Sequence, residues 1–269
     1  MKRIIAVANQ KGGVGKTTTA VNLGASLAAT RRRVLLIDLD PQGNATMGCG
    51  IEKSSLEFGV GDVLLGECET ARAILPLAEV AGMSLLPSNQ DVTAAEVRLL
   101  TMITGRELRL RVALAKVMNS YDVILIDCPP TLNMLTVNAL VAAESVLVPM
   151  QCEYYALEGL TALLGTVEQI RVSVNPGLEL EGILRTMFDP RNNLSNEVSS
   201  QLLQHFGGKV FRTIIPRNVR LAEAPSFGKP ALLHDKDSRG ALAYLALAGE
   251  MLRREDEQLE QIEHARADR

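Results

Sequence analysis

The chain has 269 residues, of which 47% are hydrophobic but only 3% aromatic, so its core must be built from aliphatic side chains. The net charge of −3 argues against a protein that binds polyanions with its whole surface. The four cysteines form no CxxC pair, which argues against a zinc or redox motif.

Short apolar segments alternate along the chain with segments of helical periodicity. The expected strands span residues 3–8, 33–37, 83–86, 122–126, 145–148, 181–187 and 210–214. The expected helices span residues 16–29, 93–100, 106–118, 132–142, 158–172, 197–205 and 240–261, and residues 41–82 look most like loop broken by short helical pieces. This alternation predicts a single α/β domain whose mostly parallel, twisted sheet is flanked by helices on both faces.

The strongest motif follows the first expected strand and opens the first helix. It consists of Lys11, Gly12, Gly13, Val14, Gly15, Lys16, Thr17 and Thr18. Glycines let the backbone turn tightly and point its N–H groups at phosphate oxygens. Lys16 is placed to reach the terminal phosphates and the Thr17 hydroxyl to bind Mg²⁺. A dinucleotide G-x-G-x-x-G loop does not fit, because Thr18 stands where the third glycine belongs. The alternatives are a P-loop NTPase or an ordinary glycine-rich turn.

The motif departs from the general P-loop pattern, since Gln10 replaces its first glycine and Lys11 is an extra lysine. In this form it resembles the deviant Walker A motif of the ParA/MinD family of ATPases. The resemblance implies that Lys11 crosses to the phosphates of a second subunit, so that ATP joins two copies into a dimer.

Two apolar strands end in carboxylates that suit phosphoryl transfer. Asp38 and Asp40 follow the second strand in a segment, residues 37–44, that resembles switch I of the partition ATPases. Asp40 is our candidate for orienting the attacking water beside the metal, and Asp38 for supporting the Mg²⁺ shell. Asp127 ends the run 123–127 in a Walker B arrangement and is expected near Mg²⁺. The predicted metal site is thus Thr17, Asp40 and Asp127, with Lys11, Lys16 and Asp40 as catalytic residues. The alternative is that Asp38 and Asp40 cap a loop.

The last third of the chain is locally basic. Residues 185–239 hold nine Lys or Arg against five Asp or Glu, an excess of +4, which leaves −7 for the rest. The string IPRNVRLAEAPSFGKP, residues 215–230, resembles the Soj-like ParA proteins, and the resemblance extends from residue 3 to about residue 252. It implies that Pro216, Arg217 and Asn218 lie against adenine. It also implies that Arg191 and Arg220 contact DNA without reading its sequence. The alternative is that these arginines are solvated or pair with Asp189 and Glu223.

The resemblance implies a Mg²⁺-dependent ATPase that partitions a chromosome or plasmid. Its ATP dimer would bind double-stranded DNA, and a ParB-type protein would trigger hydrolysis and release. We expect an ATPase domain over residues 1–252, without an amino-terminal helix-turn-helix domain, and a charged helical tail over residues 253–269. No stretch approaches the roughly 18 apolar residues of a membrane span. A cytoplasmic, nucleoid-associated protein is therefore expected.

Three other classes of protein are alternatives to a ParA-type ATPase. A MinD-like membrane switch ends in a basic amphipathic helix, whereas residues 250–269 hold seven acids against four bases. A nitrogenase-reductase-like protein needs paired cysteine ligands, and Cys128 has no convincing neighbour. A metabolic ligase of the dethiobiotin or cobyrinate type shares the P-loop, but the residue 215–230 string and the basic patch argue against it.

Overall fold

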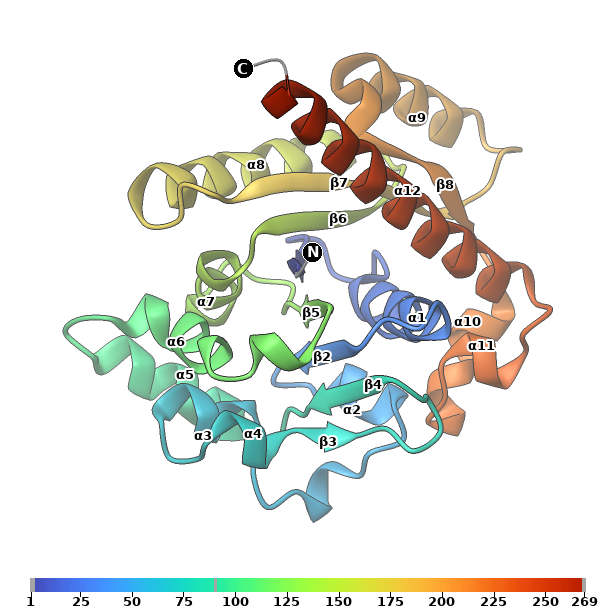
Figure 1. Ribbon diagram of the computed structural model, residues 1–269. Helices are drawn as coiled ribbons and strands as arrows, with labels where there is room; N and C mark the ends of the chain where they lie inside the picture. The colour runs from blue at the N-terminus through green and yellow to red at the C-terminus, as the bar shows by residue number, and fades with distance from the viewer. Residues whose placement is uncertain (1–2, 90, 268–269) are drawn as a thin grey trace.

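The computed structural model describes residues 3–89 and 91–267. Within this part of the chain, eight strands form one twisted sheet in the order β3-β4-β2-β5-β1-β6-β7-β8 (Figure 1). All neighbouring strands run parallel except β3 and β4. The strands are β1 Arg3–Val7, β2 Val34–Asp38, β3 Leu75–Pro76, β4 Met83–Leu86, β5 Val123–Asp127, β6 Ser145–Gln151, β7 Glu179–Phe188 and β8 Val210–Pro216.

Helices cover both faces of the sheet because the strands are apolar on both sides. In β1, Ile4 and Ala6 belong to one buried cluster and Ile5 and Val7 to the other. The second cluster lies under α1 (Lys16–Ala29), α2 (Asn44–Gly48), α10 (Val219–Glu223), α11 (Ala231–His234) and α12 (Arg239–Ala267). The first lies under α3 (Val60–Leu65), α4 (Thr70–Ala73), α5 (Asp91–Thr101), α6 (Arg109–Ala115), α7 (Met134–Ala142), α8 (Ala156–Ser173) and α9 (Asn193–Phe206).

A buried polar contact fixes the helix that follows the glycine-rich loop. The hydroxyls of Thr19 on α1 and Tyr244 on α12 lie 3.0 Å apart, and both side chains are almost fully buried. Helix α12 also packs along α1 and β8 (Figure 1). The long last helix therefore holds the loop-bearing helix in place against the sheet.

The predicted α/β architecture is confirmed, and all seven expected strands occur, although several extend further. Strand β3 was not predicted, since two residues ending in proline carry no strand periodicity. The short helical pieces expected within the loop-like region 41–82 are α2, α3 and α4.

The prediction of one continuous helix over residues 106–118 is wrong. Three elements occupy this region: the 3-10 turn η2 (Arg106–Leu108), helix α6, and the 3-10 turn η3 (Met118–Ser120). Asn138 on α7 accepts from the Leu110 amide and donates to the Arg106 carbonyl, so a side chain takes the backbone groups that a continuous helix would use. Helix α12 continues past residue 252 to Ala267, and the predicted division there stays a prediction.

Candidate nucleotide site

The glycine-rich loop and two acidic strand ends meet at one edge of the sheet. Strand β5 lies between β1 and β2, with Asp127 in register with Val7 on one side and Asp38 on the other. The loop leaves β1 directly after Val7. Because these three strands are parallel neighbours, their carboxyl ends bring together groups that are far apart in the sequence.

The loop has the backbone shape of an anion cradle. Gly13 and Gly15 have φ angles of +73° and +87°, which residues with a side chain rarely adopt. Gly15 precedes the 14-residue helix α1, and glycine has no side chain to cap the first N–H groups of the helix. Thr186, at the end of β7, donates to the Val14 carbonyl at 2.8 Å and holds the loop against the sheet. The helix terminus is thus left open for an anion.

The two lysines of the loop have different surroundings. Lys16 is only 7% exposed, and its ammonium donates to the carbonyl oxygen of Lys11 at 3.1 Å. Burial lowers the pKa of Lys16, while the nearby Asp127 carboxylate acts in the opposite direction. Lys11 reaches outward, and its ammonium forms an ion pair with Glu153 at the rim. A buried cation facing the loop favours a bound phosphate there.

Asp127 has the features of a carboxylate that needs a cation. It is fully buried, and within the described residues no hydrogen bond is formed to either of its carboxylate oxygens, although the Thr17 hydroxyl lies close to it. Burial raises its pKa well above the ordinary value, and the Asp38 carboxylate adds to this effect. An orphaned buried carboxylate is costly unless a positive charge compensates it, so the site fits Mg²⁺. In the described residues, no group of three or more His, Cys, Asp or Glu side chains is arranged to hold a metal, so further oxygens must come from Thr17, water or phosphate.

Asp38 fastens the switch I segment rather than pointing freely into the site. One of its oxygens accepts from both the amide and the hydroxyl of Thr46 at 2.7 Å, and the other accepts from the Asp40 amide at 3.2 Å. These bonds engage both oxygens within the segment, and the predicted role of Asp38 in supporting the Mg²⁺ shell stays a prediction. Thr46 was missed, since a threonine in a short helix gives no signal in the sequence.

Asp40 is held just beyond this anchor. It is 8% exposed, and one carboxylate oxygen accepts from the Gln42 amide at 2.9 Å. Ser88, after β4, donates its hydroxyl to the Asp40 carbonyl at 2.7 Å. Ser88 is a second residue that the sequence did not reveal, and it fixes the position of Asp40 relative to the sheet.

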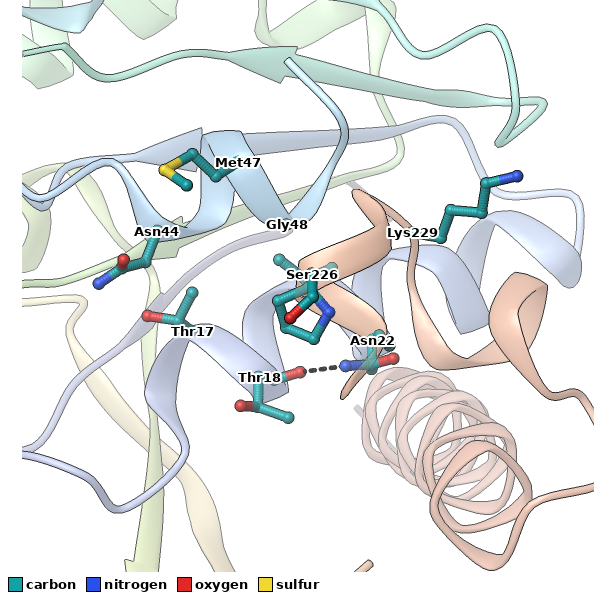
Figure 2. A pocket seen from close by; sticks show the side chains of 11 residues that line it. Thr17, Thr18, Asn22, Asn44, Met47, Gly48, Ser226 and Lys229 are labelled. Atoms are coloured by element: carbon teal, nitrogen blue, oxygen red, sulfur yellow. Dashed lines mark hydrogen bonds between the residues drawn. The ribbon is translucent and has the colours of Figure 1, made fainter. Parts of the chain in front are cut away.

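A cavity of about 400 Å³ lies beside the loop, between α1, α2 and the turn η5 (Ala224–Phe227). Figure 2 shows Thr17, Thr18 and Asn44 around it, with Ser226 opposite. The Asn22 amide donates to the Thr18 carbonyl at 2.8 Å (Figure 2), and its oxygen accepts from the Ala231 amide of α11 at 2.7 Å, which ties α1 to α11 beside the cavity. The cavity continues the site along the first turns of α1.

The predicted adenine residues lie outside this cavity. Pro216 ends β8 and pairs with Phe188 of β7, two residues beyond the Thr186 that contacts the loop. Asn218 accepts from the Leu221 amide at 3.3 Å and caps α10, and Arg217 stands between them. All three are therefore at the same edge of the sheet as the loop but are displaced toward β8.

The two predicted DNA contacts are exposed and ion-paired. The Arg191 side chain is 88% exposed and binds Asp189 through two hydrogen bonds of 3.0 and 2.8 Å. Arg220 contacts Glu223 at 2.8 Å and Asp235 at 3.2 Å. Arg217 also lies close enough to help Arg191 lower the pKa of Asp189, to about 2. The alternative pairing of these arginines with Asp189 and Glu223 is thus present, although exposed pairs open at little cost.

Comparison with known proteins decides the family. The family model described as an AAA domain matches residues 2–180. The chromosome partitioning protein ParA of Caulobacter vibrioides is 51% identical, over 94% of this chain and 95% of its own. The sporulation initiation inhibitor protein Soj of Bacillus subtilis is 52% identical, over 93% of this chain and 98% of its own.

This chain belongs to the ParA/Soj family of chromosome-partitioning ATPases. It is therefore an ATP-hydrolysing P-loop enzyme, as the glycine-rich loop predicted.

Solved structures agree with this ParA/Soj fold. A Mycobacterium smegmatis structure described as cobyrinic acid a,c-diamide synthase with bound ATP analogue and magnesium is 42% identical, with a TM-score of 0.81 over 94% of this chain and 95% of that one. The Pyrococcus furiosus cell division ATPase MinD is 24% identical, with a TM-score of 0.78 over 94% and 99% of the two chains, which shows the fold alone. None of the helices in the described part of this chain combines the length and apolarity required to cross a membrane.

Proposed function

We propose that this ParA/Soj-family ATPase acts as a DNA-partitioning switch. ATP and Mg²⁺ join two copies into a dimer, the dimer binds double-stranded DNA of the nucleoid without sequence preference, and a ParB-type centromere-binding protein stimulates hydrolysis and release. The observation that carries the proposal is Asp127, whose unpartnered buried carboxylate lies at the strand ends beside an open glycine-rich loop.

The glycine-rich loop and its neighbours bind the nucleotide and the metal. The amides of residues 12–18 and the start of α1 hold the phosphates of ATP, and the buried Lys16 neutralises their charge. Thr17 and Asp127 hold Mg²⁺, and Asp40 assists them from switch I. Pro216, Arg217 and Asn218 contact adenine. When bound, Mg²⁺ offsets the charge that develops on the phosphate oxygens.

Asp40 acts in the hydrolysis of ATP. Its carboxylate lies on a segment fastened by Asp38, Thr46 and Ser88, so its position is fixed before water arrives. From there Asp40 orients the attacking water in line with the terminal phosphorus. Lys11, at the rim, completes the charge around the phosphates of the partner subunit.

DNA contact rests on Arg191 and Arg220, whose side chains are 88% and 52% exposed. Both are ion-paired in the isolated subunit, and exposed pairs of this kind contribute only about 0 to 1 kcal/mol. Phosphates of DNA therefore replace the carboxylates readily, and a dimer doubles the number of such contacts.

A nucleotide-dependent DNA assay tests the proposal. DNA retention is compared in gel shifts with ATP, ADP and no nucleotide, followed by ATP turnover with and without DNA and a ParB-type protein. We expect retention with ATP alone and the fastest turnover with DNA and the partner together. Equal retention in all three nucleotide states would contradict the switch.

A second candidate is a metabolic ligase, which the described activity of the 42%-identical M. smegmatis protein favours. In that case cobyrinic acid and an amide donor, rather than DNA and a ParB-type protein, would stimulate ATP turnover. The same turnover assay with these small substrates separates the two candidates.

A further inference from the structure

Lys11 does not project freely from the glycine-rich loop. Its ammonium forms an ion pair with Glu153, in the segment between β6 and α8, and the two side chains are 41% and 43% exposed. The partners are 142 positions apart in the sequence, so the fold creates the contact. A lysine that is engaged with a carboxylate of its own subunit is withheld from any other anion.

The backbone around this pair is held firmly. Asn9, 7% exposed, accepts from the Lys11 amide at 3.0 Å and donates to the Pro149 carbonyl of β6 at 2.8 Å. Lys16 binds the Lys11 carbonyl. Glu153 is fixed in turn, because its amide donates to the Gln151 carbonyl at 2.9 Å. Only the two side chains remain free to exchange partners, so the contact can open without rebuilding the loop.

Two exposed tyrosines adjoin the pair. Tyr154 and Tyr155 follow Glu153, are 74% and 70% exposed, and lie with their rings 5.0 Å apart, edge to face. Tyrosine is enriched where protein surfaces meet. A second copy of this chain seated on the edge that carries the nucleotide would cover both rings and reach Lys11 at the same time.

We propose that Glu153 is an autoinhibitory partner of Lys11: it holds the lysine in the isolated subunit and releases it to the phosphates of the second subunit when the dimer closes. This inference rests on the role of Lys11 in the proposed function. Each subunit must break its own Lys11–Glu153 ion pair before the dimer can close. The free energy of this pair therefore opposes dimerisation twice, once for each subunit. An exposed ion pair shifts an equilibrium by up to about five-fold, which gives up to about 25-fold for the dimer.

The first experiment measures dimerisation by sedimentation velocity with a non-hydrolysable ATP analogue and Mg²⁺. Glu153→Gln should lower the dimer dissociation constant several-fold and up to about 25-fold, and high salt should reduce the difference. Glu158→Gln is the matched control, because Glu158 is an exposed carboxylate in the first turn of α8. It should behave like the unmodified protein. A Glu153→Gln protein that dimerises no better than this control overturns the proposal.

The second experiment needs no nucleotide. Acetylation of lysines by N-hydroxysuccinimide acetate is followed by mass spectrometry, with thermal unfolding to verify that each variant is folded. Lys11 should react about two- to five-fold faster in Glu153→Gln than in Glu158→Gln. Equal rates overturn the pairing even if the dimer forms. If the unmodified protein does not dimerise but Lys11 is protected as expected, the ATP-driven dimer of the proposed function is contradicted. The ion pair between Lys11 and Glu153 is still supported in that case.

Discussion

Gly50 and Gly228 meet backbone to backbone. A Cβ atom on Gly228 would lie 2.7 Å from the Cα of Gly50, and one on Gly50 would lie 2.8 Å from the carbonyl oxygen of Gly228. Both have positive φ angles, +79° and +62°. Gly50 follows α2, just beyond switch I, and Gly228 follows η5, shortly after Arg220. The contact therefore joins the nucleotide side of the molecule to the segment proposed to hold DNA.

Gly228→Ala should destabilise the protein by about 2 to 4 kcal/mol, because the methyl group meets backbone atoms and the backbone conformation disfavours alanine. Urea unfolding measures the change. Gly165→Ala is the control: the added Cβ meets nothing within 4 Å inside α8, so stability should rise by up to about 1 kcal/mol. Equal stability of the Gly228→Ala and unmodified proteins would refute the close approach.

Lys16→Ala should weaken ATP binding at least about 100-fold, since a buried cation that faces the phosphates is removed. Titration with a fluorescent ATP analogue measures the affinity. Lys11→Ala is the comparison, and it should still bind nucleotide as a single subunit. Similar affinities for Lys16→Ala and the unmodified protein would remove Lys16 from the site.

Asp40→Ala should lower ATP turnover about 100-fold or more while nucleotide binding persists, because the water loses its orienting group. The trapped dimer should remain on DNA after ATP is added, which a filter-retention time course follows. Release at the normal rate would assign the chemistry to another residue.

Arg220→Glu should abolish DNA retention and leave ATP-driven dimerisation unchanged. Reversal of a charge at a phosphate contact also lowers the salt dependence of any residual binding. Arg98→Glu is a matched control, because Arg98 lies on α5, away from α10, and is exposed and ion-paired with Glu67, which follows α3. Its DNA retention should stay normal, and loss of retention in both variants would indicate a nonspecific charge effect.

The pair between Arg33 and Asp122 predicts a pH dependence of stability. Hydrogen bonds from the Arg33 side chain and amide lower the pKa of Asp122 to about 2, from an ordinary value of 3.8. A lowered folded-state pKa stabilises the protein above the unfolded-state value, and this stabilisation is lost as the pH falls toward 2.

Asp122→Asn should therefore cost about 1 kcal/mol between pH 5 and pH 8, after allowance for solvent screening, and almost nothing near pH 2. Urea unfolding at several pH values measures the difference. A gap that widens as the pH falls would have the wrong sign and would exclude this pair as its source.

The sequence predicted the parts of the fold that depend on local patterns. Apolar runs ending at Asp38 and Asp127 and the glycines before α1 carry their own periodicity and spacing. The two-residue strand β3 and the short helix α2 do not, because tertiary contacts rather than local preference form them. The same limit applies within the site: the bonds from Thr46, Ser88 and Thr186 join distant segments, and nothing in the local sequence announces them.

The order of strands in the sheet also has a consequence for how the chain folds. Neighbouring β1, β5 and β2 bring together residues 3–7, 123–127 and 34–38, so nearly half of the polypeptide must be in place before the nucleotide can be held. A partly folded chain lacks the nucleotide site. ATP therefore binds and stabilises only the fully folded protein. Cellular ATP should accordingly protect newly made protein from degradation, and a truncated product should gain no such protection.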